Sequence, residues 1–304
     1  EIVIVANPLV AELFSPHPDC DRVIIYDKKG QHQGIRGRWQ LCQKLRREHF
    51  DLAILFQNAM EAAIITWVAG IPRRAGYTTD SRRLLLNHQI PIGDTERRLH
   101  HTDYYLNLLS SLGIAAAKTP LRLFNTGDEL LWAQKKLAQN NNWTTINPGA
   151  SYGSAKRWIP ERFASVADHL NKKYQQNIVL IGGPGEQDIG RDIEKMMSHQ
   201  PLNLIGKTSV REMMAILASC ALLITNDSGP MHVAAALNTP LVAIFGPTDH
   251  TTTSPMTSKA SLIHKDTPCA PCLLRQCPKE HQCMLAVTAE EVFQAAASLL
   301  DSHQ

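Results

Sequence analysis

The sequence has no long hydrophobic run and only a small excess of positive charge. No stretch of about eighteen apolar residues occurs in the 304 residues, so no bilayer-spanning helix is predicted. The formal net charge of +3 is too small to indicate a nucleic-acid partner. The opening residues, EIVIVANPL, lack the basic region and cleavage site of a secretory signal. We therefore expect a cytoplasmic protein that does not bind nucleic acid.

Two common nucleotide-binding motifs are also missing. Neither GxxxxGK[ST] nor GxGxxG occurs, which argues against a P-loop ATPase and an ordinary NAD-binding domain. The seven cysteines are odd in number and unevenly placed, which argues against a secreted disulfide framework.

Four cysteines gather near the end of the chain, at Cys269, Cys272, Cys277 and Cys283. The first spacing is typical of zinc, but the later spacings are irregular and no second CxxC follows. We predict no metal site and no cofactor. Structural zinc at these thiols remains the weaker alternative to buried or oxidation-prone cysteines.

Apolar runs alternate with amphipathic segments along the chain, which predicts an α/β protein with parallel sheets covered on both faces. In the second half we predict strands at 144–147, 178–182, 202–205, 221–225 and 241–245, with helices near 160–174, 186–199, 209–220 and 229–237. In the first half we predict strands at 1–6, 22–26 and 51–56, with helices near 8–14, 36–48, 59–69, 101–112 and 128–140.

The run of asparagines around Asn140 breaks the last of these helices, so we place a domain boundary there. The predicted domains are residues 1–140 and 141–287. A final amphipathic helix at 288–301, within the segment 288–304, could cross back to brace the first domain.

Residues 223–237, LITNDSGPMHVAAAL, hold a strand that ends directly before a helix. The first N–H groups of a helix lack partners within it and carry partial positive charge, so this junction suits a phosphate. Ser228 and Gly229 bring those donors close, and His232 lies one turn into the helix. An ordinary capped helix is the alternative.

Two further turns repeat this pattern of a strand followed by glycine. Residues 145–158 contain Gly149 and Lys156, and residues 178–186 contain three glycines and Glu186, an acidic side chain suited to ribose hydroxyls. Polar turns at the carboxyl ends of successive parallel strands predict a ligand crevice, and a nucleotide is the expected ligand.

Adjacent arginines recur in the loops of the first half. Each pair alone is typical of a solvated rim, but together they favour an anionic partner because guanidinium matches phosphate and carboxylate. The eight are Arg36, Arg38, Arg73, Arg74, Arg82, Arg83, Arg97 and Arg98.

These segments resemble the ADP-heptose:lipopolysaccharide heptosyltransferases of glycosyltransferase family 9, most closely the heptosyltransferase II group. The resemblance spans nearly the whole chain and is carried by NPLVAELFSPHPDCDRVI, DLAILFQNAMEAA, NPGASYGSAKRWIPERFA, LIGGPGE, TNDSGPMHVAAALNTPLVAIFGPTDH and PCAPCLLRQCPKEHQCM. It implies the GT-B fold of two Rossmann-like domains, with an acceptor-binding first domain and a nucleotide-sugar-binding second domain. It also implies metal-independent, inverting transfer of heptose from ADP-heptose to heptosyl-Kdo2-lipid A in the lipopolysaccharide core.

The resemblance also implies roles for individual residues. Asp227 would bind heptose hydroxyls, Ser228 and Gly229 would donate to the diphosphate, and His232 would lie near the sugar or phosphate. Lys156 would neutralise the leaving group. Fixed donors aimed at the β-phosphate agree with this chemistry, because departure of ADP builds negative charge there.

A second group of residues would hold the rest of the donor. Ser151 would add a hydroxyl, and Gly149, Gly183 and Glu186 would contact the nucleotide. Contacts to the base are expected from the turn that ends at Thr208. The acceptor would be an anionic, lipid-linked saccharide, so we expect contact with the inner face of the inner membrane. We also expect a monomeric protein.

One feature of the family pattern is not matched. Family members open with a strand and a Gly-rich turn that carries the aspartate expected to act as base, and this chain starts at what resembles the second strand. We therefore expect an incomplete, weakly stable first domain and poor turnover. A nucleotide-sugar-binding protein without turnover and a nucleotide-sugar 2-epimerase remain alternatives.

Overall fold

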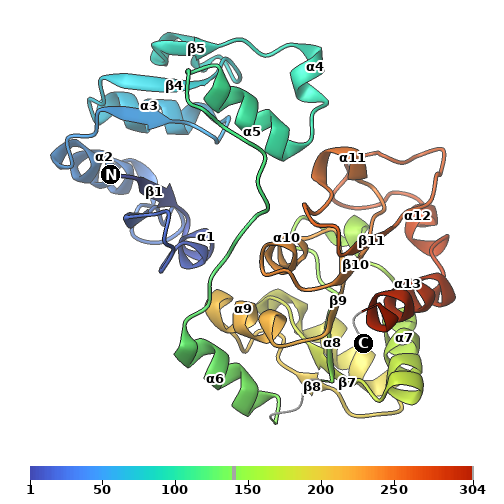
Figure 1. The fold of residues 1–304 in the computed structure, drawn as a ribbon. Helices are drawn as coiled ribbons and strands as arrows, with labels where there is room; N and C mark the ends of the chain where they lie inside the picture. Colours follow the sequence, from blue (N-terminus) through green and yellow to red (C-terminus); the bar gives the residue numbers. More distant parts are fainter. Residues whose placement is uncertain (139–141, 303–304) are drawn as a thin grey trace. The chain divides into compact units, whose positions relative to one another are not determined.

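The computed structural model describes residues 1–138 and 142–302. The chain divides into two compact units, Glu1–Thr119 and Pro120–Gln304. The boundary predicted near Asn140 lies outside the described residues. Figure 1 shows strands and helices alternating along each unit, which confirms the predicted α/β class.

The first unit is built from short parallel strands joined by helices. β1 pairs with β2, and β3, β4 and β5 form a separate sheet in that order; the strands of both sheets are parallel. Its elements are β1 (Val3–Ala6), α1 (Pro8–Leu13), β2 (Arg22–Ile25), α2 (Gly34–Arg47), β3 (Leu52–Ile54), α3 (Met60–Val68), β4 (Arg73–Tyr77), η1 (Arg82–Leu85), β5 (His88–Ile90), α4 (Asp94–Arg97) and α5 (His101–Ser110).

Strands β4 and β5 are absent from the sequence prediction. β4 begins with Arg73 and Arg74, so only a short apolar stretch follows and no apolar run indicates a strand. β5 contains two polar residues. Arg74 donates to the carbonyl of Leu85 at 2.8 Å. Arg82 is fully buried and donates to the Tyr77 carbonyl at 2.9 Å.

These contacts correct part of the expectation that the arginine pairs face an anionic partner. Arg82 and Arg74 bind carbonyl oxygens, Arg73 donates to the Asp51 carbonyl at 3.2 Å, and Arg83 donates to the Gln89 amide oxygen at 3.0 Å. Burial lowers the pKa of Arg82. Arg82 is therefore a structural residue of the first unit, whereas Arg73 and Arg83 are exposed and an anionic partner for them stays a prediction.

The second unit is a doubly wound sheet. Its elements are α6 (Gly127–Lys136), β6 (Trp143–Asn147), η2 (Ser154–Lys156), α7 (Pro160–Tyr174), β7 (Asn177–Leu180), η3 (Pro184–Glu186), α8 (Gln187–Met196), β8 (Leu202–Asn203), α9 (Val210–Ala218), β9 (Leu222–Asn226), α10 (Gly229–Ala236), β10 (Leu241–Ile244), α11 (His250–Thr253), β11 (Ala260–Ile263), α12 (Gln282–Leu285) and α13 (Ala289–Asp301).

The six strands of this sheet are parallel and lie in the order β11-β10-β9-β6-β7-β8. From β6 the chain first builds outward through β7 to β8, and then returns to the other side of β6 with β9. The order of winding therefore reverses between β6 and β9. Ligands of open α/β sheets bind at the carboxyl ends of the strands at such a switch point.

Helices cover both faces of the sheet, as Figure 1 shows. α7, α8 and α13 pack on one face around Trp158, Phe163 and Phe293, while α9 and α10 cover the other and α6 packs on α9. We expected that α13 could brace the first domain. Its apolar residues contact α7 and β9–β11 within the second unit, and a contact with the first domain stays a prediction.

Candidate active site

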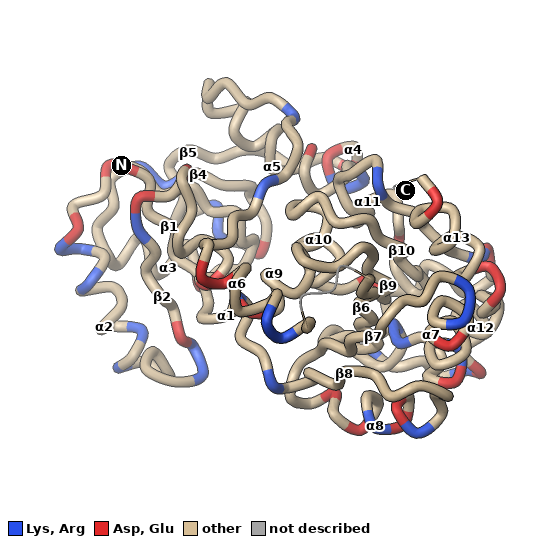
Figure 2. Tube along the Cα trace, turned by 60° about the horizontal axis from the view of Figure 1, so that its bottom comes forward, with Lys and Arg blue, Asp and Glu red and all other residues tan. Residues whose placement is uncertain are grey.

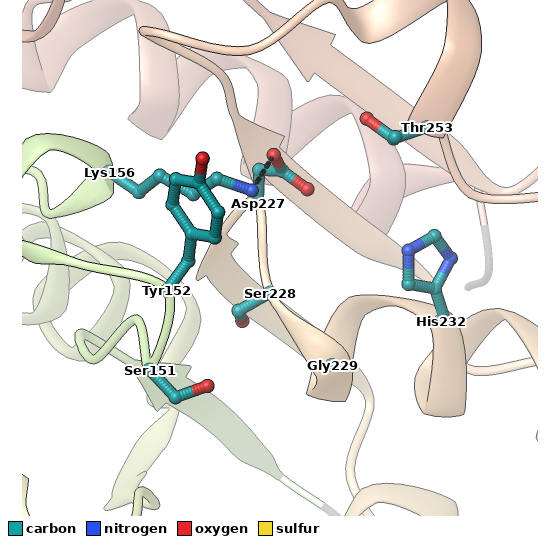
Figure 3. A pocket seen from close by; sticks show the side chains of 8 residues that line it. All are labelled: Ser151, Tyr152, Lys156, Asp227, Ser228, Gly229, His232 and Thr253. Carbon is teal, nitrogen blue, oxygen red and sulfur yellow. Dashed lines mark hydrogen bonds and ion pairs between the residues drawn. The ribbon is translucent and has the colours of Figure 1, made fainter. Parts of the chain in front are cut away.

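A pocket of about 220 Å³ lies at the switch point of the second unit. Its walls come from the loops that follow β6, β9 and β10, three neighbouring strands of the sheet. The residues that line it are Ser151, Tyr152, Lys156, Asp227, Ser228, Gly229, His232 and Thr253. Figure 3 shows these side chains around one open space.

Helix α10 presents its N-terminus to this pocket. The backbone of Ser228 is extended and its side chain makes no capping hydrogen bond to the helix. Its Oγ atom instead accepts a hydrogen bond from Nδ2 of Asn147, at 2.8 Å. Apart from its chain neighbours and the backbone of its own helix, no heavy atom of the described residues lies within 4 Å of the position that a Cβ would take at Gly229. The start of α10 is therefore open to a ligand and is not capped by Ser228.

Lys156 and Asp227 form a buried ion pair beside this helix. The Lys156 Nζ to Asp227 Oδ2 distance is 2.6 Å, and the two side chains are 12% and 4% exposed. Thr248 Oγ1 donates to the same carboxylate oxygen at 2.6 Å. In Figure 3 the second carboxylate oxygen points away from Lys156, toward the side of the pocket that holds His232 and Thr253.

This arrangement keeps binding capacity for a ligand on both partners. An ammonium group has three donors, so Lys156 can remain bonded to Asp227 and still donate to a phosphate. A carboxylate accepts on both oxygens, so Asp227 can accept from a sugar hydroxyl on its second oxygen. The pair thus offers a cation for a phosphate and an acceptor for a hydroxyl in one pocket.

Asn226, the last residue of β9, connects the two loops that carry the pair. It is fully buried, and its Oδ1 atom accepts from the backbone N–H of Trp158 at 3.0 Å. Its Nδ2 atom donates to the carbonyl of Pro148 at 2.8 Å and to that of Gly149 at 3.3 Å. Both ends of the loop that carries Lys156 are therefore bonded to the residue that precedes Asp227.

The segment that contains the four clustered cysteines supports the same loop from outside. The Arg275 carbonyl accepts from the N–H of Ala155 at 3.0 Å, and Tyr152 donates its hydroxyl to the carbonyl of Leu273 at 2.8 Å. His281 Nε2 lies 2.5 Å from the Ala155 carbonyl oxygen. The segment is thus in direct contact with the loop that carries Lys156.

The zinc alternative finds no support in the part of the chain that the structure describes. There, no three His, Cys, Asp or Glu side chains are grouped to hold a metal ion. All four cysteines are free thiols, and burial raises the pKa of Cys283. Of the four, Cys283 is buried and packs in the core of the second unit.

The structure separates the predicted site residues into two groups. Those that line the pocket are Ser151, Lys156, Asp227, Ser228, Gly229 and His232. Gly149, Gly183, Glu186 and Thr208 are not among its lining residues. Glu186 Oε2 accepts from the N–H of Gly183 at 2.7 Å, and a Cβ at residue 149 would overlap the Glu186 carboxylate. Gly149, Gly183 and Glu186 therefore pack together, and Thr208 lies in the loop before α9.

Sequence reasoning did not identify Tyr152, Thr253, Thr248, Asn147 or Asn226. Tyr152 and Thr253 line the pocket, and the other three hold its residues in place. Asn147 and Asn226 both end a buried strand of the sheet, at the edge where the ligand crevice was predicted. A polar amide in that position is a signal that could have identified them.

Comparison with known proteins gives a consistent result. Residues 38–283 match the family model of glycosyltransferase family 9 (heptosyltransferase). The chain is 34% identical to lipooligosaccharide heptosyltransferase 2 of Campylobacter jejuni, over 96% of this chain and 86% of that protein. It is 32% identical to lipopolysaccharide heptosyltransferase 2 of Escherichia coli K12, over 75% of this chain and 69% of that protein. The solved structure of E. coli ADP-heptose lps heptosyltransferase II superposes with a TM-score of 0.83 at 26% identity, covering 99% of this chain and 90% of that one.

Proposed function

The chain belongs to glycosyltransferase family 9, the heptosyltransferases, and transfers heptose to the inner core of lipopolysaccharide; we propose that ADP-heptose is its donor and that the pocket at α10 binds the donor's diphosphate. The observation that carries this proposal is the uncapped start of α10 beside Lys156. Backbone donors and an ammonium group there match the charge of a diphosphate.

The same groups account for the catalytic role of the pocket. When the bond between the anomeric carbon and the ADP oxygen breaks, negative charge grows on the β-phosphate. Donors fixed before the reaction stabilise that charge more than they stabilise the bound substrate, which lowers the barrier. The N-terminus of α10 and Lys156 supply this stabilisation without a metal ion, and Asp227 orients the heptose through its hydroxyls.

The remaining donor contacts are proposed from the second group of residues. Glu186 packs against Gly149 and Gly183, beside the loop that carries Ser151, and we propose its carboxylate as the acceptor for the ribose hydroxyls. The turn that ends at Thr208 would contact the base. We propose an anionic, lipid-linked saccharide as the acceptor.

The acceptor implies where the protein works. No helix within residues 1–138 and 142–302 is long and apolar enough to cross a membrane. Because the proposed acceptor is anchored in lipid, we propose that the protein acts at the cytoplasmic face of the inner membrane.

A transfer assay tests the proposal. The chain is incubated with ADP-heptose and either Kdo2-lipid A or heptosyl-Kdo2-lipid A, and the product mass and released ADP are measured. We expect one heptose to be added to the heptosylated acceptor only. Transfer to Kdo2-lipid A would contradict the proposal that this chain adds the second heptose of the core. Binding of ADP-heptose without any transfer would contradict turnover by this chain.

A further inference from the structure

Residues 28–47 of the first unit form the most basic stretch of the chain. They contain seven lysines and arginines and no aspartate or glutamate, whereas the whole chain carries a net charge of only +3. The seven are Lys28, Lys29, Arg36, Arg38, Lys44, Arg46 and Arg47. Five of them belong to helix α2. In Figure 2 the Lys and Arg segments along α2 are separated by uncharged residues only.

One side of α2 packs into the unit and the other faces solvent. Gly37, Leu41, Cys42 and Leu45 are the buried residues of the helix, and the last three pack in a core cluster with residues of β2 and α3. Because a helix turns once in 3.6 residues, these four positions lie on one side. Ile35, Arg36 and Trp39, on the opposite side, are exposed to solvent.

Two large apolar side chains lie on that exposed side. Ile35 is 87% exposed and Trp39 is 52% exposed, and they are one helical turn apart. A tryptophan and an isoleucine exposed to water together are not explained by the core of the unit. Such side chains are favoured at the boundary between lipid and water.

Basic side chains surround this apolar pair. Arg36, Lys44 and Arg47 are exposed on the same half of the helix. Arg38 pairs with Glu61 at 2.6 Å and Arg46 donates to the Val68 carbonyl at 2.5 Å, so those two contribute to the fold. The exposed half of α2 therefore combines two apolar anchors with three cations. We call Ile35, Arg36, Trp39, Lys44 and Arg47 the α2 face.

We propose that the α2 face binds the surface of a bilayer that contains anionic lipids. A basic amphipathic helix lies flat on such a surface, with its apolar residues among the headgroups and its cations on lipid phosphates. Each Lys or Arg near an anionic surface contributes about 1 kcal/mol of binding free energy. This inference rests on the proposed function, because a lipid-linked acceptor requires the enzyme to approach the membrane.

The full chain is tested by sedimentation with two kinds of vesicle, one of phosphatidylcholine alone and one of phosphatidylcholine with about 30% phosphatidylglycerol. The second has an anionic surface, to which each cation of the protein should contribute ~1 kcal/mol of binding free energy. We expect binding to the anionic vesicles only, and release at high salt because screening shortens the range of the charges. Arg36→Gln with Lys44→Gln should weaken binding about 30-fold, since two cations contribute roughly 2 kcal/mol. Trp39→Ser should also weaken it.

Helix α6 offers matched controls. Leu131 is 54% exposed, and Lys135 and Lys136 are exposed in its last turn. Lys135→Gln with Lys136→Gln changes the net charge by the same amount as the α2 pair, and Leu131→Ser removes an exposed apolar side chain. Both control variants should bind vesicles as the unchanged chain does.

Two results would overturn the inference. The first is a failure of the unchanged chain to bind anionic vesicles, and the second is equal weakening by the α2 and α6 variants. The free energy of unfolding of each variant, measured in parallel, should equal that of the unchanged chain, and a loss there would mean that the substitutions act on the fold. Vesicle binding that persists in a chain without heptose transfer would support the α2 face while contradicting the proposed function.

Discussion

Substitution of Asn226 tests whether the loop that carries Lys156 must be held in place. The Asn226 side chain accepts one hydrogen bond from Trp158 and donates two, to the carbonyls of Pro148 and Gly149. None of these three hydrogen-bond partners lines the pocket. The effect of Asn226 on turnover should therefore arise only through the position of Lys156 relative to Asp227.

The magnitude follows from the groups that lose their partners. Asn226→Ala leaves the N–H of Trp158 and the carbonyl of Pro148 buried and unbonded, and each such group costs about 1–3 kcal/mol. We expect the free energy of unfolding to fall by about 3 kcal/mol. Asn226→Asp keeps the acceptor for Trp158 but turns a carboxylate oxygen toward two carbonyls, so it should also be destabilising.

The matched control is Thr239→Val. Thr239 is buried just before β10 and donates its hydroxyl to the carbonyl of Leu217 at 2.9 Å, at the end of the sheet opposite the pocket. Urea unfolding should show a loss of stability in both variants. In a heptose-transfer assay at a temperature where both remain folded, kcat should fall at least tenfold for Asn226→Ala and stay unchanged for Thr239→Val. Equal kcat values would refute the positioning role of Asn226.

Three further predictions concern single side chains. Lys156→Met should lower kcat by about 100-fold or more, as loss of a transition-state donor does, and should abolish the thermal shift on adding ADP; an unchanged shift would contradict diphosphate binding by this residue. Gly153→Ala should weaken ADP binding measured by calorimetry, because the added Cβ would overlap the backbone carbonyl of Arg275 and displace the loop; unchanged affinity would argue against the importance of that contact. The ammonium of Lys265 and the N-terminal groups of α13 lower the pKa of Glu291 from 4.5 to about 2. Since the folded-state pKa is depressed, this stabilisation is present above about pH 4.5 and is lost as the pH falls toward 2. With a side chain 38% exposed, Glu291→Gln should cost only about 0.5 kcal/mol at pH 7, and the difference in urea unfolding should shrink on acidification; a difference independent of pH would contradict this.

The alternation of apolar and amphipathic segments was sufficient to predict the second unit. β7, β9 and β10 lie where periodicity places them, because each is a mainly apolar strand of a parallel sheet. β6 also lies where it was predicted, although it contains two buried threonines. β4 was missed because Arg73 and Arg74 open it, and their side chains bond to carbonyls of the same unit. Local pattern does not reveal such bonds.

The site was predictable in its residue types but not in its connections. The motif around Asp227 predicted a phosphate site, yet the hydrogen bond that holds the Ser228 side chain comes from Asn147, 81 residues earlier in the chain. The bond from Thr248 to Asp227 likewise joins separate loops. Contacts of this kind depend on the order of the strands, which brings β6, β9 and β10 together.

The position of a bound donor tests the central claim most directly. A crystal structure of the full chain with ADP-heptose should show β-phosphate oxygens about 2.7–3.2 Å from the N–H of Gly229 and from Nζ of Lys156. It should also show a heptose hydroxyl on the carboxylate of Asp227. A diphosphate bound elsewhere, with the pocket at α10 empty and the pair of Lys156 and Asp227 unchanged, would contradict the account.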